Sequence, residues 1–285
     1  MKLNFLHSVF GLFLSVSLLI NPVNAGVIGV FGDYNNSNLV SNLSSLGHTV
    51  TYLGAEAEQD LSSYDSVWGV SAWNILSTTE QGYLSSYLGQ GGGLYLTGER
   101  SCCETLNDSV ETFLNSVVLS AGLQIGGLGD AGSSATINST AIGGLASAPN
   151  TVLNWDTSIF GGISGVSGDN IVATSSTTGT TVAAAWDMSD LLNNSGRVML
   201  AMDVNWHSNA NGNDLAILEN IEVFLSGATA NAVSVPEPSV LAIFALVIAV
   251  RVGITDNQIL YYFLGSLPWQ LHVRLLYFTM LFSAP

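Results

Sequence analysis

The sequence predicts an α/β fold: a three-layer sandwich on a mainly parallel sheet, with a β-rich insertion and apolar helices at both termini. Three observations support this prediction. Short apolar runs alternate with segments of helical periodicity from residue 27 to residue 121, which indicates βαβ units. Residues 122–196 lose that periodicity and are rich in Gly, Ser, Thr and Asn. Long apolar segments occupy both ends of the chain.

The first half predicts four strands separated by helices. Its opening run, Val27–Phe31, is continuously apolar, as strands buried on both faces of a parallel sheet are. A helix with Leu39 and Leu43 on its apolar face follows and ends at Gly47. Strands that alternate with helices predict a flavodoxin-like or Rossmann-like sandwich, because parallel neighbours need helical crossovers. The other expected elements of this half are strands at 48–53, 66–70 and 94–97 and helices at 78–88 and 104–121.

Residues 122–196 predict an insertion of short strands joined by Gly-rich turns, such as 170–175 and 180–186. We expect this insertion to return to the same sheet. The elements that complete the domain, which spans residues 26–228, are a strand at 197–204 and a helix at 214–226.

The chain is strongly acidic: 21 Asp and Glu oppose 5 Lys and Arg, and the formal net charge is −16. Between residues 26 and 235 only Arg100 and Arg197 are basic, against 19 acids. Such a surface cannot neutralise phosphates, so nucleic-acid binding is excluded, as is attachment to anionic lipids through a basic patch. Charged residues make up only 9% of the chain. Small polar residues must therefore cover its surface, as in many secreted proteins.

Residues 1–25 are typical of a secretory signal peptide. A basic residue near the start and the apolar run Phe5–Ile20 precede a Pro-containing helix break. Val23 and Ala25 then place small residues at positions −3 and −1 of a cleavage site before Gly26. The alternative is an uncleaved membrane anchor.

Near the other end, Pro236, Glu237 and Pro238 precede the apolar run Val240–Val250. This segment, 235–254, follows a linker at 229–234 and resembles the PEP-CTERM sorting signal of Gram-negative bacteria. The resemblance implies export across the inner membrane, anchoring by a C-terminal transmembrane helix, and recognition by a membrane protease called exosortase. It further implies delivery to the cell surface or extracellular matrix, since proteins of that family accompany exopolysaccharide production.

The chain departs from the family pattern after the motif. The run to Val250 has 11 residues, whereas ~20 span a bilayer, and extending it to Ile254 gives a marginal span. Arg251 stands alone where the family has a basic cluster, and residues 255–285 form an atypical apolar extension. We hypothesise a frameshift near codon 250. Resequencing the locus tests this hypothesis, and a single intact frame with homologous tails in other proteins would contradict it.

Two passages resemble the class I glutamine amidotransferase-like fold. One is the Gly-rich turn and strand of residues 90–99, and the other is the strand of 196–203 followed by a helix containing Asn220. In active members of that family, the first strand ends in Gly-x-Cys-x-Gly, and a His-x-Glu pair completes a triad. Here Arg100 stands at the cysteine's position and Asn209 at that of the acid. The resemblance thus implies a domain whose catalytic elbow is degenerate.

Cys102, Cys103 and His207 are the remaining candidate catalytic residues. A Cys-His hydrolase activates a thiolate with an adjacent imidazole, which a third group orients. The two cysteines are neighbours in the chain, and an exported protein meets conditions that permit disulfides. The sequence leaves open whether they are free thiols or a disulfide.

Asp33, Glu99, Arg100 and Asp203 each follow or end an expected strand. Ligands of open α/β sheets bind at the carboxyl ends of the strands, so we expect these residues to converge on one ligand-binding rim. Either Arg100 forms a structural ion-pair network with Glu99 and Asp203, or the rim binds a sugar or small anion. Aromatic residues that stack on sugars or simply fill the core are Trp68, Trp73, Trp155, Trp186 and Trp206.

No cofactor or metal ion is expected at this rim. The three acids offer oxygen ligands that suit Ca²⁺, but no loop has EF-hand spacing. The turn after the first strand likewise lacks the G-x-G-x-x-G pattern of dinucleotide-binding proteins.

The sequence therefore predicts an exported, envelope-anchored protein with a non-catalytic α/β domain, in a structural or binding role associated with exopolysaccharide or biofilm. Expected partners are an exosortase-like sorting protease, extracellular polysaccharide, and the membrane through the C-terminal helix. The alternative is a secreted Cys-His hydrolase that acts on an amide or a glycan.

Overall fold

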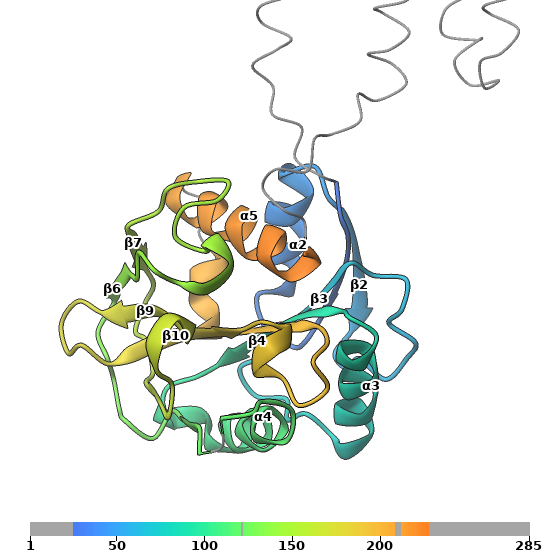
Figure 1. Ribbon diagram of the computed structural model, residues 1–285, viewed down its shortest axis with the longest axis horizontal. Helices are drawn as coiled ribbons and strands as arrows, with labels where there is room; N and C mark the ends of the chain where they lie inside the picture. Colours follow the sequence, from blue (N-terminus) through green and yellow to red (C-terminus); the bar gives the residue numbers. More distant parts are fainter. Residues whose placement is uncertain (1–24, 121, 209–211, 228–285) are drawn as a thin grey trace, which may run out of the picture. The chain divides into compact units, whose positions relative to one another are not determined.

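A computed structural model describes residues 25–120, 122–208 and 212–227. A single sheet lies between helices α2 (Asn36–Ser45) and α5 (Gly212–Ser226) on one face and α3 (Thr78–Gly89) and α4 (Glu104–Val117) on the other (Figure 1). The signal peptide, linker, sorting motif and apolar terminal helices expected from the sequence lie outside the described residues. No helix in the described ranges is both long and apolar enough to span a bilayer.

One half of the sheet is parallel, and its strands fall close to the predicted positions. The strand expected at 197–204 ends at Met202, because Asp203 takes a left-handed backbone conformation, φ 71°. In spatial order these strands are β2 (Thr49–Gly54), β1 (Val27–Phe31), β3 (Ser66–Gly69), β4 (Gly93–Gly98) and β11 (Arg197–Met202).

The other half is antiparallel, so the prediction of a mainly parallel sheet is wrong and the sheet is mixed. The inserted segment contains no helix of more than one turn to carry the chain back across the sheet, and short turns join strands in antiparallel fashion. Beyond β11 the order continues with β10 (Thr181–Trp186), β9 (Ile171–Ser175), β6 (Ser134–Ile137) and β7 (Asn154–Asp156), while β5 (Gln124–Ile125) pairs with β8 (Ile163–Ser164), which pairs with β10.

Short 3-10 helices occupy several connections. They are η1 (Ser101–Cys103), η2 (Ile142–Gly144), η3 (Gly168–Asn170), η4 (Met188–Asp190) and η5 (Val204–Ser208). Two of them position the site, because η1 follows β4 and η5 follows β11 at the same sheet edge.

The core lies on both faces of β4. Leu94 and Leu96 alternate with Tyr95 and Thr97, and all four side chains are buried. On the face that α2 and α5 cover, the Tyr95 ring stacks on that of Trp68, with 4.5 Å between centroids. Close aromatic packing therefore holds the centre of the sheet, directly beneath the edge where the rim residues emerge.

Candidate functional site

The carboxyl edge of the parallel strands brings two of the predicted rim residues together. Gly98 of β4 is paired with Met202 of β11, so Glu99 and Asp203 are the next residues on neighbouring strands. The amide of Asp203 donates to the carbonyl of Gly98 at 2.8 Å. Asp33 emerges at the same edge after β1, where its Oδ1 accepts from the amide of Ala72 at 3.1 Å.

Asp203 is buried, and its carboxylate accepts four hydrogen bonds. Oδ2 accepts from the hydroxyl of Thr157 at 2.6 Å and from the amide of Ile159 at 3.0 Å. Oδ1 accepts from the amide of Asn205 at 2.8 Å and from its side-chain amide at 2.6 Å. Asp203 thus ties the loop after β7 to the start of η5, which makes it a structural anchor with little free capacity for a ligand.

Glu99 is also buried, and its Oε1 accepts from the amide of Val204 at 2.9 Å. Asn107 of α4 holds the Glu99 backbone on both sides: its Oδ1 accepts from the Glu99 amide at 2.8 Å and its Nδ2 donates to the Glu99 carbonyl at 2.7 Å. Burial, with a smaller contribution from the charge of Asp203, raises the pKa of Glu99 to about 7. Sequence reasoning missed Asn107, whose position in α4 carries no signal of this contact.

Arg100 does not join these acids, so the expected network of Arg100 with Glu99 and Asp203 is wrong. Its guanidinium Nη1 lies 3.4 Å from Oδ2 of Asp130, in a largely exposed pair. The backbone at Arg100 is extended, with φ −62° and ψ 175°, and successive side chains of an extended chain point to opposite sides. Burial of Glu99 therefore directs Arg100 outward, where the ion pair contributes little stability.

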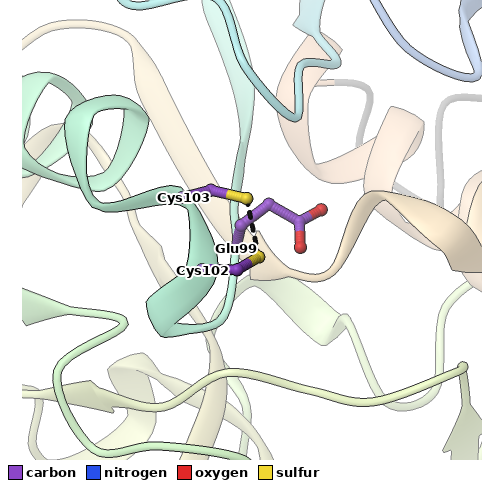
Figure 2. A group of neighbouring side chains, drawn as sticks. All are labelled: Glu99, Cys102 and Cys103. Atoms are coloured by element: carbon purple, nitrogen blue, oxygen red, sulfur yellow. Dashed lines mark hydrogen bonds between the residues drawn. The ribbon is translucent and has the colours of Figure 1, made fainter.

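Cys102 and Cys103 lie in η1, immediately before α4, and both are free thiols (Figure 2). Cys102 is exposed and Cys103 is buried, with 2.7 Å between their sulfur atoms. Burial, followed by the hydrogen bond with Cys102, raises the pKa of Cys103 to about 12. Its thiol is therefore protonated near neutral pH, unlike the activated thiolate of a cysteine hydrolase.

The two thiols and the Glu99 carboxylate form a cluster whose ligand atoms lie within 4.8 Å of one another (Figure 2). This meeting of Glu99 with the cysteines was not predicted, although the spacing Glu-x-x-Cys-Cys is the signal that could have revealed it. Thiolates prefer soft cations. Any cation here would first have to displace a proton from Cys103, whose high pKa opposes that exchange.

The different exposure of the two thiols predicts selective alkylation. Treating the folded protein with iodoacetamide at pH 7.5 should label Cys102 and leave Cys103 unlabelled, because the thiolate is the nucleophile and Cys103 is buried and protonated. Mass spectrometry of the peptide that contains both residues distinguishes one label from two. The unfolded chain is the control and should take two labels. Equal labelling rates in the folded protein would contradict the prediction.

His207, the candidate base of the alternative hydrolase, is buried against Tyr95 and Trp206, and the contacts described for its side chain include neither cysteine. Its Nε2 lies 3.2 Å from the hydroxyl of Tyr95, its ring packs on Trp206 with 3.9 Å between centroids, and its carbonyl accepts from Asn42 of α2. Burial lowers the pKa of His207 to about 3, which keeps the imidazole neutral. Asn209, which stands where active amidotransferases have the acid of the triad, lies outside the described residues.

Of the five tryptophans singled out, one is accessible to a ligand. Trp73 is 63% exposed. It follows β3, next to the loop that carries Tyr34 after β1, and Tyr34 is 41% exposed. The Tyr34 amide donates to the carbonyl of Val70 at 3.4 Å, which joins the two loops. The tryptophans that are buried in the core are Trp68, Trp155, Trp186 and Trp206.

The same sheet edge is hollowed beside these loops. An open depression of 340 Å³ is lined by the last two residues of β2 and by four residues that follow it: Leu53, Gly54, Ala55, Glu56, Glu58 and Gln59. The amide of Gly32, at the end of β1, donates to the carbonyl of Gly54 at 3.1 Å. Tyr34 lies in the loop that follows β1, and Trp73 lies in the loop that follows β3. The residues that line the depression lie at the end of β2 and just after it.

No protein-family model and no curated protein matches this chain. Solved structures resemble it in fold. The N-terminal domain of mmIFT52 is 14% identical, with 70% of this chain and 97% of that one covered and a TM-score of 0.50. A ThuA-like protein from Parabacteroides merdae is 13% identical, with 70% of this chain and 89% of that one covered and a TM-score of 0.44. A GMP synthase subunit from Thermoplasma acidophilum is 10% identical, with 70% of this chain and 94% of that one covered and a TM-score of 0.43. Identities this low concern the fold alone.

Proposed function

We propose that this chain is an exported, envelope-anchored protein whose α/β domain binds an uncharged extracellular polysaccharide without cleaving it. The leader at 1–25 and the PEP-CTERM-like segment at 235–254 support export and sorting by an exosortase-like protease, with exposure at the cell surface or in the matrix. The domain itself is proposed to be amidotransferase-like, with its catalytic elbow lost. The order of its parallel strands and helices supports this assignment.

The exposure of Trp73 supports binding more than any other observation. Burying a tryptophan on folding is strongly favourable, so a tryptophan left in water on a loop that is bonded to the loop of Tyr34, a second exposed aromatic residue, is typical of a binding surface. The flat rings suit the apolar faces of sugar rings, and Asp33 and the acids of the neighbouring depression offer hydrogen-bond acceptors for hydroxyl groups. The net negative charge of the domain would repel an anionic glycan, so the proposed ligand is an uncharged glycan.

The alternative, a Cys-His hydrolase, lacks the necessary contacts among the described residues. Cys103 is a protonated thiol and His207 is a neutral imidazole bonded to Tyr95. Neither can activate the other from these positions. Changing both Cys102 and Cys103 to serine should accordingly leave polysaccharide binding intact.

Trp73→Ala tests the proposal. With exopolysaccharide purified from the source organism as the probe, affinity electrophoresis should show that the variant binds about ten-fold more weakly. The matched control is Leu153→Ala, since Leu153 is 66% exposed and precedes β7, at the opposite edge of the sheet. Equal retardation of both variants, or no retardation of the unsubstituted chain by this polysaccharide, would overturn the proposed function.

A further inference from the structure

A cluster of acceptors surrounds the backbone of Gly26, in which His48 and Glu222 are buried and Asp65 is exposed. A Cβ atom placed on Gly26 would lie 3.0 Å from Oε1 of Glu222, 3.5 Å from Nδ1 of His48 and 3.8 Å from Oδ2 of Asp65. The amide of Gly26 donates to His48 Nδ1 at 3.1 Å, and the next amide, of Val27, donates to Asp65 Oδ2 at 2.8 Å. These groups come from the residue before β2, from α5 and from the residue before β3, and they meet at the start of β1.

Glu222 lacks a counter-charge in this cluster. Its Oε2 accepts from the hydroxyl of Ser66 at 2.5 Å and from the indole of Trp68 at 3.2 Å, whereas its Oε1 is buried without a hydrogen-bond partner. Burial raises the pKa of Glu222 to about 7, and the charge that acts on it, that of Asp65, has the same sign. An unpaired carboxylate oxygen in the interior is costly unless a cation or donor reaches it.

The peptide bond between Ala25 and Gly26 joins an exposed residue to a buried one, and Val27 after it is exposed again. Ala25 is exposed, whereas Gly26 is buried, and its carbonyl accepts from the amide of Thr49 at 2.9 Å. This bond is also the one that the small-residue pattern before Gly26 marks for cleavage. A side chain at position 26 would crowd Glu222 Oε1, so glycine is the residue that fits here.

We propose that Gly26 is the mature N-terminus and that its α-ammonium group is the missing partner of Glu222. Hydrolysis by a signal peptidase adds one water across the Ala25–Gly26 bond: the carboxylate leaves with Ala25, and the amine stays on Gly26 and takes up a proton. The amide had one hydrogen to donate, to His48, whereas the ammonium has three. One of the additional hydrogens would then serve Glu222 Oε1, the buried oxygen that lies 3.0 Å from the position of a Cβ atom on Gly26.

This inference uses the export step of the proposed function but not its polysaccharide, so the two can fail separately. Mass spectrometry of the exported protein should give a chain that begins at Gly26. A chain that begins at any other residue would overturn the inference and would leave the Trp73 binding experiment unaffected.

Two otherwise identical chains test the ion pair, one beginning at Gly26 and the other keeping Ala25, both measured in the same detergent. The second chain carries the same charge one residue further out, at an exposed position. We expect a higher thermal midpoint for the Gly26 chain. Glu222→Gln should lower that midpoint and have little effect on the Ala25 chain. Equal effects of the substitution in both chains would overturn the inference.

A reactivity measurement does not depend on any substitution. A buried, ion-paired ammonium resists acylation, so an amine-reactive ester at pH 7 should modify the N-terminus of the Gly26 chain about ten-fold more slowly than that of the Ala25 chain. Where Glu222→Gln folds, it should remove most of this protection. Equal rates for the two unsubstituted chains would show that the amine is free, which contradicts the pairing.

Discussion

Replacing Asp203 with alanine is expected to lower the free energy of unfolding by about 4 kcal/mol. Four hydrogen bonds end on this one buried carboxylate, and the alanine would leave the amide of Ile159 and the hydroxyl of Thr157 without their acceptor. Alanine must also adopt the left-handed backbone at φ 71°, which adds roughly 1 kcal/mol. Urea unfolding at pH 7 measures the loss.

Two further variants serve as comparisons for the unfolding of Asp203→Ala. Asp203→Asn keeps one acceptor oxygen and tolerates the left-handed conformation, so it should lose less than alanine does. Asp130→Ala removes an acid of the exposed pair with Arg100 and should change stability by less than ~1 kcal/mol. If Asp203→Ala lost as little stability as Asp130→Ala, the contacts of Asp203 with η5 and with the loop that follows β7 would not stabilise the fold.

The second large effect is a pH dependence centred on Glu99. The pKa of this carboxyl is raised from 4.5 to about 7 in the folded chain. Its stabilising contribution is therefore complete below the unfolded pKa and is lost as the pH rises through about 7, because ionisation then occurs inside the protein. Between pH 4.5 and about 7, the loss in the free energy of unfolding amounts to roughly 3 kcal/mol. Glu99→Gln removes the titrating group and keeps an oxygen for the amide of Val204.

The difference in unfolding free energy between Glu99→Gln and the unsubstituted chain isolates this group from others that titrate. We expect it to be small at pH 4.5 and to favour the glutamine variant at pH 8. Glu56→Gln, which removes one carboxylate from an exposed position, is the control for the change in net charge. A difference for Glu99→Gln that does not change with pH would mean that the pKa of Glu99 is the same in the folded and unfolded chains.

The positions of the central parallel strands were predictable because a strand buried on both faces is apolar without interruption, as Val27–Phe31 shows. The orientation of the inserted strands was not, because Gly-rich turns look alike in sequence whichever way the next strand runs. The partners of Arg100 escaped prediction for a related reason: neighbours in an extended chain face opposite sides. Trp73 could not be told from the other tryptophans, since exposure depends on tertiary packing.

The position of β11 has a consequence for how the molecule assembles. Leu96 in β4 pairs with Leu200 in β11, and β11 in turn pairs with β10. The last strand of the described residues therefore lies in the middle of the sheet, and without it β4 and β10 each present an unpaired edge. Joining segments so distant in the chain is slow. A chain that crosses a membrane from its N-terminus could thus not complete this sheet until nearly all of the domain has crossed.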